Sequence, residues 1–178
     1  SGYYFNEVTG DLSNGTLALN AIANLEDAQT VNVNILSHLK YQRVLRLVDK
    51  QGMSFKDANK QAQREVLAAF GLQKYAQTDV NRFSITAGTD DAAALIAVSS
   101  LILYDRTEAQ VTEYLSVLSE DFAKNGSFSD ANKLQLRKDM FGLERKLPTI
   151  ADNIKSRYEE SGKEISVKDL SYFFDWDG

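Results

Sequence analysis

The hydrophobic pattern changes character near residue 30. Before it, β-formers cluster at Tyr3-Tyr4-Phe5 and Val8, turn residues follow at 9–11 and 13–15, and residues 16–22 partly alternate between apolar and polar. This pattern is typical of a short β-hairpin. Because an isolated hairpin is marginal in water, we expect it either to pack on helices or to belong to a sheet outside this sequence. Residues 27–34 predict a polar connector with a short strand at 31–33.

Helical periodicity dominates from Asn34 onward. Apolar residues recur three and four positions apart, between N-cap residues and Gly stop signals. The predicted helices are 34–52, 54–71, 90–104, 107–125, 148–162 and 166–174, and one after Ser129 whose stripe is Leu134, Arg137 and Phe141. Residues 73–88 lack a clear period and are predicted as a loop. The fold class is therefore mainly α, a bundle of about six or seven helices with a short N-terminal β-hairpin.

The most apolar stretch lies at 92–104, where Ser99 and Ser100 are the only polar members. A membrane span needs about 20 apolar residues, and the charged pairs at 90–91 and 105–106 bound this run too tightly. We therefore expect the central buried helix of the bundle and no membrane insertion by this segment.

The composition removes several kinds of chemistry. The 178 residues include no Cys and one His, and 20 Lys and Arg against 25 Asp and Glu give a net charge of −5. Without Cys there is no disulfide, thiolate nucleophile or Cys-ligated metal, and a single His excludes a two-His metal site within one chain. The net acidity argues against nucleic acid or an anionic membrane as the main partner.

His38 is the first candidate general base, because the ordinary pKa of histidine lies near neutrality. It follows Ser37 on a predicted helix, and adjacent helix residues do not face each other, so we expect no Ser37–His38 dyad. The simpler interpretation is a polar side chain hydrogen-bonded to a neighbouring segment. We assign no catalytic residue and expect a protein that is not an enzyme.

Basic residues recur at helical spacing on the same predicted helix, at Lys40, Arg43, Arg46 and Lys50. Since acidic residues outweigh basic ones over the chain, this row predicts a solvated face rather than a nucleic-acid-binding stripe.

Calcium needs neither Cys nor His, so the acidic segments invite a test for it. Residues 121–132 place Asp, Asn and Gly at loop positions 1, 5 and 6 of an EF-hand. Position 3 is Ala123 and position 12 is Asn132, where the motif needs an oxygen ligand and a bidentate Glu. A helix end at Asn125-Gly126 and an N-cap at Ser129 explain the same residues without a metal.

Asp175 and Asp177 are the metal-ligand candidates of the chain. They fit positions 1 and 3 of a calcium loop whose remainder would lie beyond Gly178. Two ligands alone do not hold the ion, so the default interpretation is a solvated acidic tail without a cofactor, with calcium reserved for a longer protein. The start at Ser1-Gly2, without Met or an export signal, also leads us to expect a piece of a longer protein.

Several segments share the pattern of one family: 2–10 (GYYFNEVTG), 31–39 (VNVNILSHL), 52–55 (GMSF), the run ending at 99–103 (SSLIL), and 175–178 (DWDG). In these segments the chain resembles a family of uncharacterised surface lipoproteins of Bacteroidetes. The resemblance implies a helical module adjoining an immunoglobulin-like β-domain, an extracytoplasmic location at the cell surface or outer membrane, and a lipid-anchoring Cys upstream. The resemblance implies that residues 1–30 are a hairpin at the junction with that β-domain, or a remnant of the β-domain. Residues 31–178 would then be the helical bundle domain.

Three functions remain open at this point. The leading one is a non-enzymatic extracytoplasmic module that spaces, docks or binds neighbouring domains or surface partners of a multidomain lipoprotein. The second is a glycan- or peptide-binding module that uses exposed aromatic side chains, at Tyr3, Tyr4, Tyr75 and Tyr172. The third is a hydrolase. A pocket with converging polar groups would favour binding or catalysis, and a flat apolar patch would favour docking.

Overall fold

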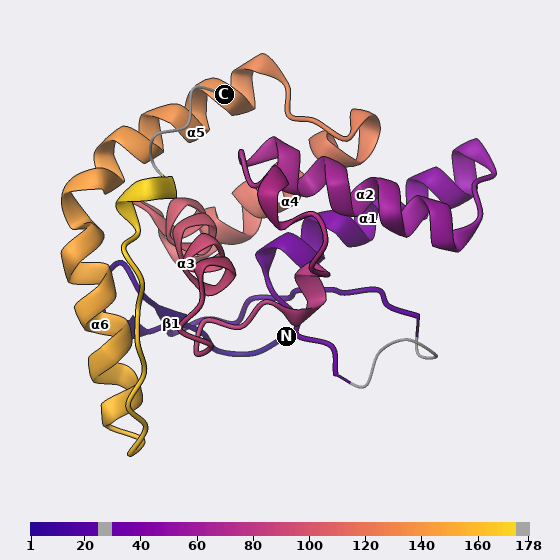
Figure 1. Cartoon of the computed structure of the whole chain (residues 1–178). Helices are drawn as coiled ribbons and strands as arrows, with labels where there is room; N and C mark the ends of the chain where they lie inside the picture. Colours follow the sequence, from indigo (N-terminus) through magenta and orange to yellow (C-terminus); the bar gives the residue numbers. More distant parts are fainter. Residues whose placement is uncertain (25–29, 174–178) are drawn as a thin grey trace.

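A hairpin and six α-helices form the computed structural model over the residues it describes, 1–24 and 30–173 (Figure 1). The strands are β1 (Phe5–Asn6) and β2 (Asp11–Leu12). The α-helices are α1 (Ile35–Gln51), α2 (Phe55–Ala69), α3 (Asp90–Leu103), α4 (Glu108–Asn125), α5 (Asp130–Leu143) and α6 (Leu147–Glu159). Short 3₁₀ turns lie at η1 (Gln73–Tyr75), η2 (Val80–Arg82), η3 (Glu144–Lys146) and η4 (Ser171–Phe173). The predicted mainly α fold with a short N-terminal hairpin is confirmed.

The hairpin packs on the helices, which was the first of the two expectations. Its strands pair antiparallel with Phe5 opposite Leu12, and an isolated bridge joins Gly2 to Leu17 farther from the turn. Val8 and Leu17 are buried in the same apolar core as the helices. The helical core therefore supplies the burial that a two-stranded hairpin lacks on its own.

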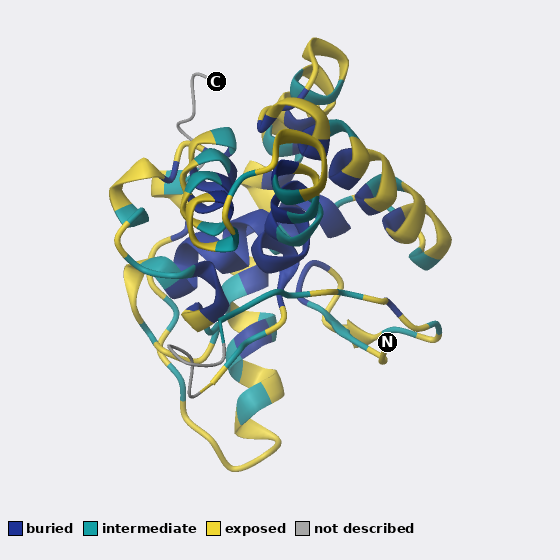
Figure 2. Ribbon diagram, turned by 90° about the vertical axis from the view of Figure 1, so that its right-hand side faces the viewer, coloured by how far each residue is buried: buried dark blue, intermediate teal, exposed yellow. Residues whose placement is uncertain are grey.

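Helix α3 is the buried centre of the molecule, as the apolar run predicts. Its side chains at 92–98 and 100–103 are all buried, and Figure 2 shows the buried residues gathered centrally with exposed ones on the outer helix faces. Within the described residues, no helix has both the length and the apolarity that a membrane span requires.

Local capping signals set several of the helix ends. At the start of α1, the Asn34 side chain accepts from the backbone N–H of Ser37, whose Oγ accepts from the N–H of Asn34. Gly52 and Gly126 end α1 and α4 in the left-handed conformation, with φ of 65° and 71°. These motifs are local in sequence, which is why they predicted the boundaries well.

Helix α5 presents a different face to the core from the one predicted. Leu134 and Phe141 are 53% and 74% exposed, and Arg137 is exposed too, whereas the buried residues are Leu136, Asp139 and Leu143. The predicted stripe was wrong because it did not count Asp139, whose partner lies on a distant segment. Asp139 faces inward and pairs with the largely buried side chain of Arg106.

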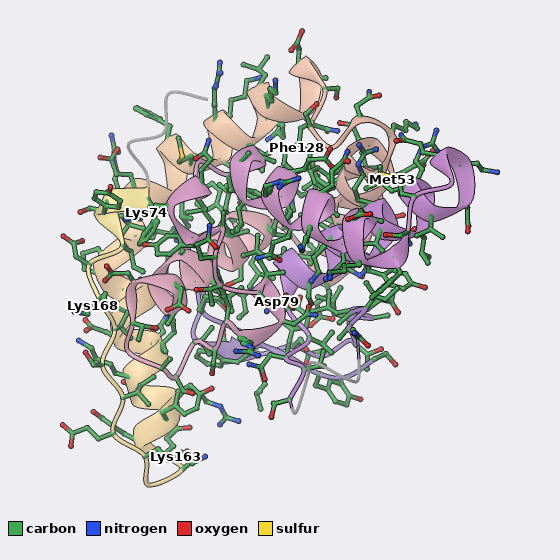
Figure 3. The ribbon with its side chains drawn as sticks, turned by 45° about the vertical axis from the view of Figure 1, so that its right-hand side comes forward. Met53, Lys74, Asp79, Phe128, Lys163 and Lys168 are labelled. Atoms are coloured by element: carbon green, nitrogen blue, oxygen red, sulfur yellow. The ribbon has the colours of Figure 1, made fainter. Side chains whose placement is uncertain are left out.

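The predicted helix over 166–174 is wrong as far as the structure describes it. After α6 the chain reverses near Lys163 and returns past Lys168 without helical structure, as Figure 3 shows, before the short turn η4. Ile165 and Val167 alternate toward the core, and Asp169 Oδ1 accepts the N–H of Ser171 at 2.9 Å. Asp169 therefore takes part in a local turn rather than in the first turn of a helix.

The predicted strand at 31–33 is also absent from the described structure. Asn32 instead lies along η2, where its N–H donates to the carbonyl of Asn81 at 2.7 Å and its side chain donates to the carbonyl of Phe83 at 3.2 Å. A 3₁₀ turn offers no strand edge for a ladder, so the connector stays irregular.

Candidate functional site

An open cavity of about 680 Å³ lies between the hairpin, α3 and α6. In Figure 1 these elements meet where β1 passes below α3 and beside α6. Most of the lining is aliphatic or aromatic, from the hairpin region, the start of α1, the loop before α3, α3 itself and α6: Tyr4, Phe5, Leu17, Leu19, Ile35, Ile85, Leu95, Ile96, Leu103, Ile154 and Tyr158. Its volume falls within the range of about 300–1,000 Å³ that small-molecule sites occupy.

Glu7 is the ionisable group in the wall between the hairpin and α3. The residue is 8% exposed, its carboxyl contacts the hydroxyl of Ser99, and the hydroxyl of Ser100 lies 3.4 Å from the same carboxyl oxygen. Burial raises the pKa of the Glu7 carboxyl, and the serine hydrogen bonds only partly oppose this rise. Burial disfavours the charged form because little water remains to solvate it.

The hydrogen-bond geometry of Ser99 agrees with a protonated Glu7. A hydroxyl has one proton to donate, and Ser99 Oγ lies 3.1 Å from the carbonyl oxygen of Ile96, which can only accept. Ser99 therefore donates to one of these two oxygens at a time: to the Glu7 carboxylate when that group is ionised, or to the Ile96 carbonyl when the protonated Glu7 carboxyl is itself the donor.

Helix α6 forms the charged mouth of the cavity. Arg157 Nη1 lies 3.3 Å from Glu160 Oε2, and the Arg157 guanidinium lies 5.9 Å from the centre of the Phe5 ring. The side chain of Asn153 donates to the backbone carbonyl of Glu7 at 2.9 Å, which ties α6 to the hairpin. The cavity therefore combines an apolar interior, a buried carboxyl with a raised pKa and an ion pair facing solvent.

His38 has the role that the simpler interpretation gave it. Its Nδ1 accepts the backbone N–H of Asn20 at 3.0 Å, and burial lowers its pKa. Ser37 is committed to the cap of α1 through its contacts with Asn34, so the two side chains form no catalytic dyad. A neutral His38 thus holds the segment after the hairpin against α1.

The basic row on α1 is not a solvated face, and that prediction was wrong for two of its four members. Lys40 has no exposed surface and pairs with Asp79 at 2.9 Å; Figure 3 labels Asp79 near the centre of the view. Arg43 Nε and Nη2 donate to the Glu65 carboxylate at 2.7 and 3.0 Å. Only Arg46 and Lys50 are exposed. Lys40 and Arg43 turn inward because they pair with acidic residues of other segments, Asp79 and Glu65.

The calcium candidates have different outcomes. Asp121 Oδ2 accepts the N–H of Ser129 at 2.7 Å and the side chain of Asn132 at 2.6 Å, so these residues join the end of α4 to the start of α5. These hydrogen bonds lower the pKa of Asp121 despite its partial burial, which acts in the opposite direction. Asp175 and Asp177 lie outside the described residues. Over 1–24 and 30–173, no group of three His, Asp or Glu side chains is placed to hold a metal ion.

The four tyrosines proposed as an exposed aromatic surface separate into different places. Tyr4 lines the cavity and Tyr3 is 70% exposed on the hairpin. Tyr75 and Tyr172 lie on either side of Lys74, whose Nζ is 4.9 and 3.9 Å from their ring centres; Figure 3 places Lys74 beside the C-terminal turn. They form no single binding platform.

Sequence reasoning missed Glu7 and the cavity. Two signals were available: an acidic residue among the β-formers of the hairpin, and the two serines in the otherwise apolar run of α3. Neither signal shows that these groups meet, because 92 residues separate Glu7 from Ser99.

Comparisons with models of known protein families, with curated proteins and with solved structures find no match to this chain. The functional proposals therefore rest on the cavity itself.

Proposed function

We propose that the chain is a non-enzymatic binding module whose cavity receives the apolar part of a small amphipathic ligand. The observation that carries this proposal is the open, mostly apolar cavity between the hairpin, α3 and α6. Its volume and mostly apolar lining are those of a small-molecule site, and a ligand that covers this wall removes apolar surface from water.

The lining favours an amphipathic molecule over a glycan. Sugars present many hydroxyl groups, and each one needs a hydrogen-bond partner when it leaves water. The interior of this cavity offers mainly hydrocarbon and ring surface, with Glu7 and Ser99 as its inner polar pair. Polar groups gather at the mouth instead, where Arg157 and Glu160 lie.

The same polar pair supports binding more than hydrolysis. A serine nucleophile needs a base that removes its proton. Ser99 Oγ lies within hydrogen-bond reach of both Glu7 and the carbonyl of Ile96, and the raised pKa of Glu7 favours the acid form, which is a donor rather than a base.

The cellular setting belongs to the same proposal. The resemblance to surface lipoproteins of Bacteroidetes supports an extracytoplasmic module beside a β-domain, with the lipid anchor in a preceding segment. Within such a protein, neighbouring domains or surface partners would present or receive the ligand.

A cavity-filling variant tests the binding role. n-Octanol, a neutral amphipathic probe, is titrated into the protein by calorimetry and by thermal shift, which reports any ligand that binds the folded state. Ile85→Trp adds bulk to the cavity wall, and Val117→Trp adds the same group on α4 at a site outside this lining. We expect Ile85→Trp to weaken octanol binding by about tenfold or more, and Val117→Trp to leave it unchanged.

Two results would overturn the proposed function. One is the absence of octanol binding to the wild-type protein. The other is equal octanol affinity in the wild type and in a folded Ile85→Trp variant, with folding checked by circular dichroism.

A further inference from the structure

We propose that the natural ligand carries a protonated amine, and that this ammonium group pairs with Glu7 inside the cavity. This inference rests on the binding role proposed above and names the chemical class of the ligand. The inference follows from how the buried charged side chains of the protein are paired.

Every other buried ionisable side chain with a full charge has an opposite partner. Among the described residues, Lys40 pairs with Asp79 at 2.9 Å, Arg43 with Glu65 at 2.7 Å, and Asp139 with Arg106. Glu7 is buried to the same degree, yet no described cation lies within ion-pair distance of it. Buried carboxyls in proteins are usually paired, so Glu7 is the exception to be explained.

The surroundings of Glu7 leave the positive partner to the ligand. Helix α3 offers it only the hydroxyls of Ser99 and Ser100. From the hairpin, Tyr4 faces the cavity with its pKa raised by burial first and by Glu108 and Glu7 next, so it stays neutral. From α6 come Tyr158 in the wall and, at the mouth, Arg157 and Glu160, which pair with each other.

An ammonium group fits this place better than an alcohol or a carboxylate. A hydrogen bond between an ammonium and a carboxylate is about twice as strong as a neutral one, and the apolar surroundings of Glu7 strengthen it further. A ligand carboxylate gains no opposite charge from Glu7 and is repelled once Glu7 ionises. The cost of removing the ammonium from water is offset by the carboxylate that Glu7 becomes when its proton leaves.

Amine binding therefore releases a proton. The free protein holds Glu7 as the acid, and the ligand enters as an ammonium ion. The Glu7 O–H bond breaks, its proton leaves to solvent, and the resulting carboxylate accepts an ammonium N–H. Below the pKa of Glu7 in the free protein, amine affinity rises by about tenfold per pH unit, because one proton is released per ligand bound.

The test compares n-octylamine with n-octanol, which has the same chain and no charge. Calorimetry in two buffers of different ionisation enthalpy counts the protons released, at several pH values on the full chain. Glu7→Gln keeps a donor for Ser99 but cannot ionise, and Glu159→Gln makes the same charge change on an exposed residue of α6 outside the cavity lining. We expect Glu7→Gln to weaken octylamine binding by about tenfold or more, to abolish proton release and to spare octanol, while Glu159→Gln changes none of these.

The outcomes separate this inference from the binding role on which it rests. Two outcomes would overturn the amine proposal and leave the apolar binding site standing. In one, octanol binds and octylamine binds no more tightly; in the other, octylamine binds the wild type and Glu7→Gln with equal affinity. Failure of both probes to bind the wild-type protein overturns both proposals.

Discussion

Glu7 and Ser99 touch through their side chains although 92 residues separate them in the chain. The contact joins the hairpin to the buried helix α3, and Asn153 joins the same residue to α6 through the backbone carbonyl of Glu7 at 2.9 Å. One residue of the hairpin thus contacts both of the other main elements that line the cavity, α3 and α6. Such a tie explains how a short hairpin stays ordered against a helical bundle.

The first prediction concerns stability and pH. Burial raises the pKa of Glu7 above its usual value of 4.5, so the folded protein holds this proton more tightly than the unfolded chain. The resulting stability is complete below that value and is lost as the pH rises through the folded-state pKa. Urea unfolding at several pH values should show the wild type losing stability relative to Glu7→Gln with rising pH, by up to about 1.4 kcal/mol per pH unit. A difference that does not change with pH would show that Glu7 does not titrate in this way.

The second prediction concerns the buried pair Arg106–Asp139. Arg106 also donates to the carbonyl of Tyr104 at 2.9 Å and lies 3.7 Å from the centre of the Tyr114 ring, so it joins the end of α3 to α4 and α5. Asp139→Ala leaves the guanidinium buried without its partner and should lower the free energy of unfolding by about 3–5 kcal/mol. Chemical denaturation measures the loss.

The exposed pair Lys124–Glu120 is the matched control for that prediction. Both side chains are at least half exposed, and their atoms lie 3.2 Å apart. Glu120→Ala should cost less than about 1 kcal/mol, because exposed ion pairs contribute little. Similar losses in Asp139→Ala and Glu120→Ala would contradict the role given to the buried pair.

The third prediction concerns the face that α5 presents to the core. Leu136 is fully buried, whereas Phe141 is 74% exposed. Leu136→Ala should destabilise the protein by about 2–5 kcal/mol, and Phe141→Ala should change its stability by less than about 0.5 kcal/mol. Thermal and urea unfolding of the two variants give the comparison. The reverse order would restore the stripe predicted from the apolar pattern.

The fourth prediction concerns Gly142, inside α5. A methyl group there would overlap the ring and hydroxyl of Tyr104. Alanine favours a helix by about 1 kcal/mol over glycine, yet we expect Gly142→Ala to destabilise the protein by about 1–3 kcal/mol because of this overlap. Adding Tyr104→Leu should recover part of the loss by removing the ring. A more stable Gly142→Ala variant would mean that Tyr104 lies elsewhere.

The sequence predicted those features that local interactions decide. Asn34 with Ser37, and Gly126 after α4, are cap signals whose partners lie within a few residues, so the helix ends followed from them. The burial of α3 followed from a run in which almost every residue is apolar.

Features that depend on distant partners could not be predicted in the same way. From residue type alone, Lys40 and Asp139 would be placed on the surface. Their burial depends on the distant partners Asp79 and Arg106, which the local sequence does not indicate. The C-terminal segment carries cap-like residues, but the packing of Ile165 and Val167 keeps it out of a helix. The cavity needs segments from both ends of the chain and from its middle, so no single stretch of sequence could reveal it.

The most direct measurement of the central claim is the ionisation of Glu7 itself. Protein labelled with ¹³C at the glutamate carboxyls is titrated by NMR, with Glu7→Gln used to assign the Glu7 signal. In the free protein this signal should titrate at a higher pH than those of exposed glutamates, and saturating n-octylamine should move its titration to a lower pH while n-octanol does not. A Glu7 signal whose titration octylamine leaves unchanged would contradict the account.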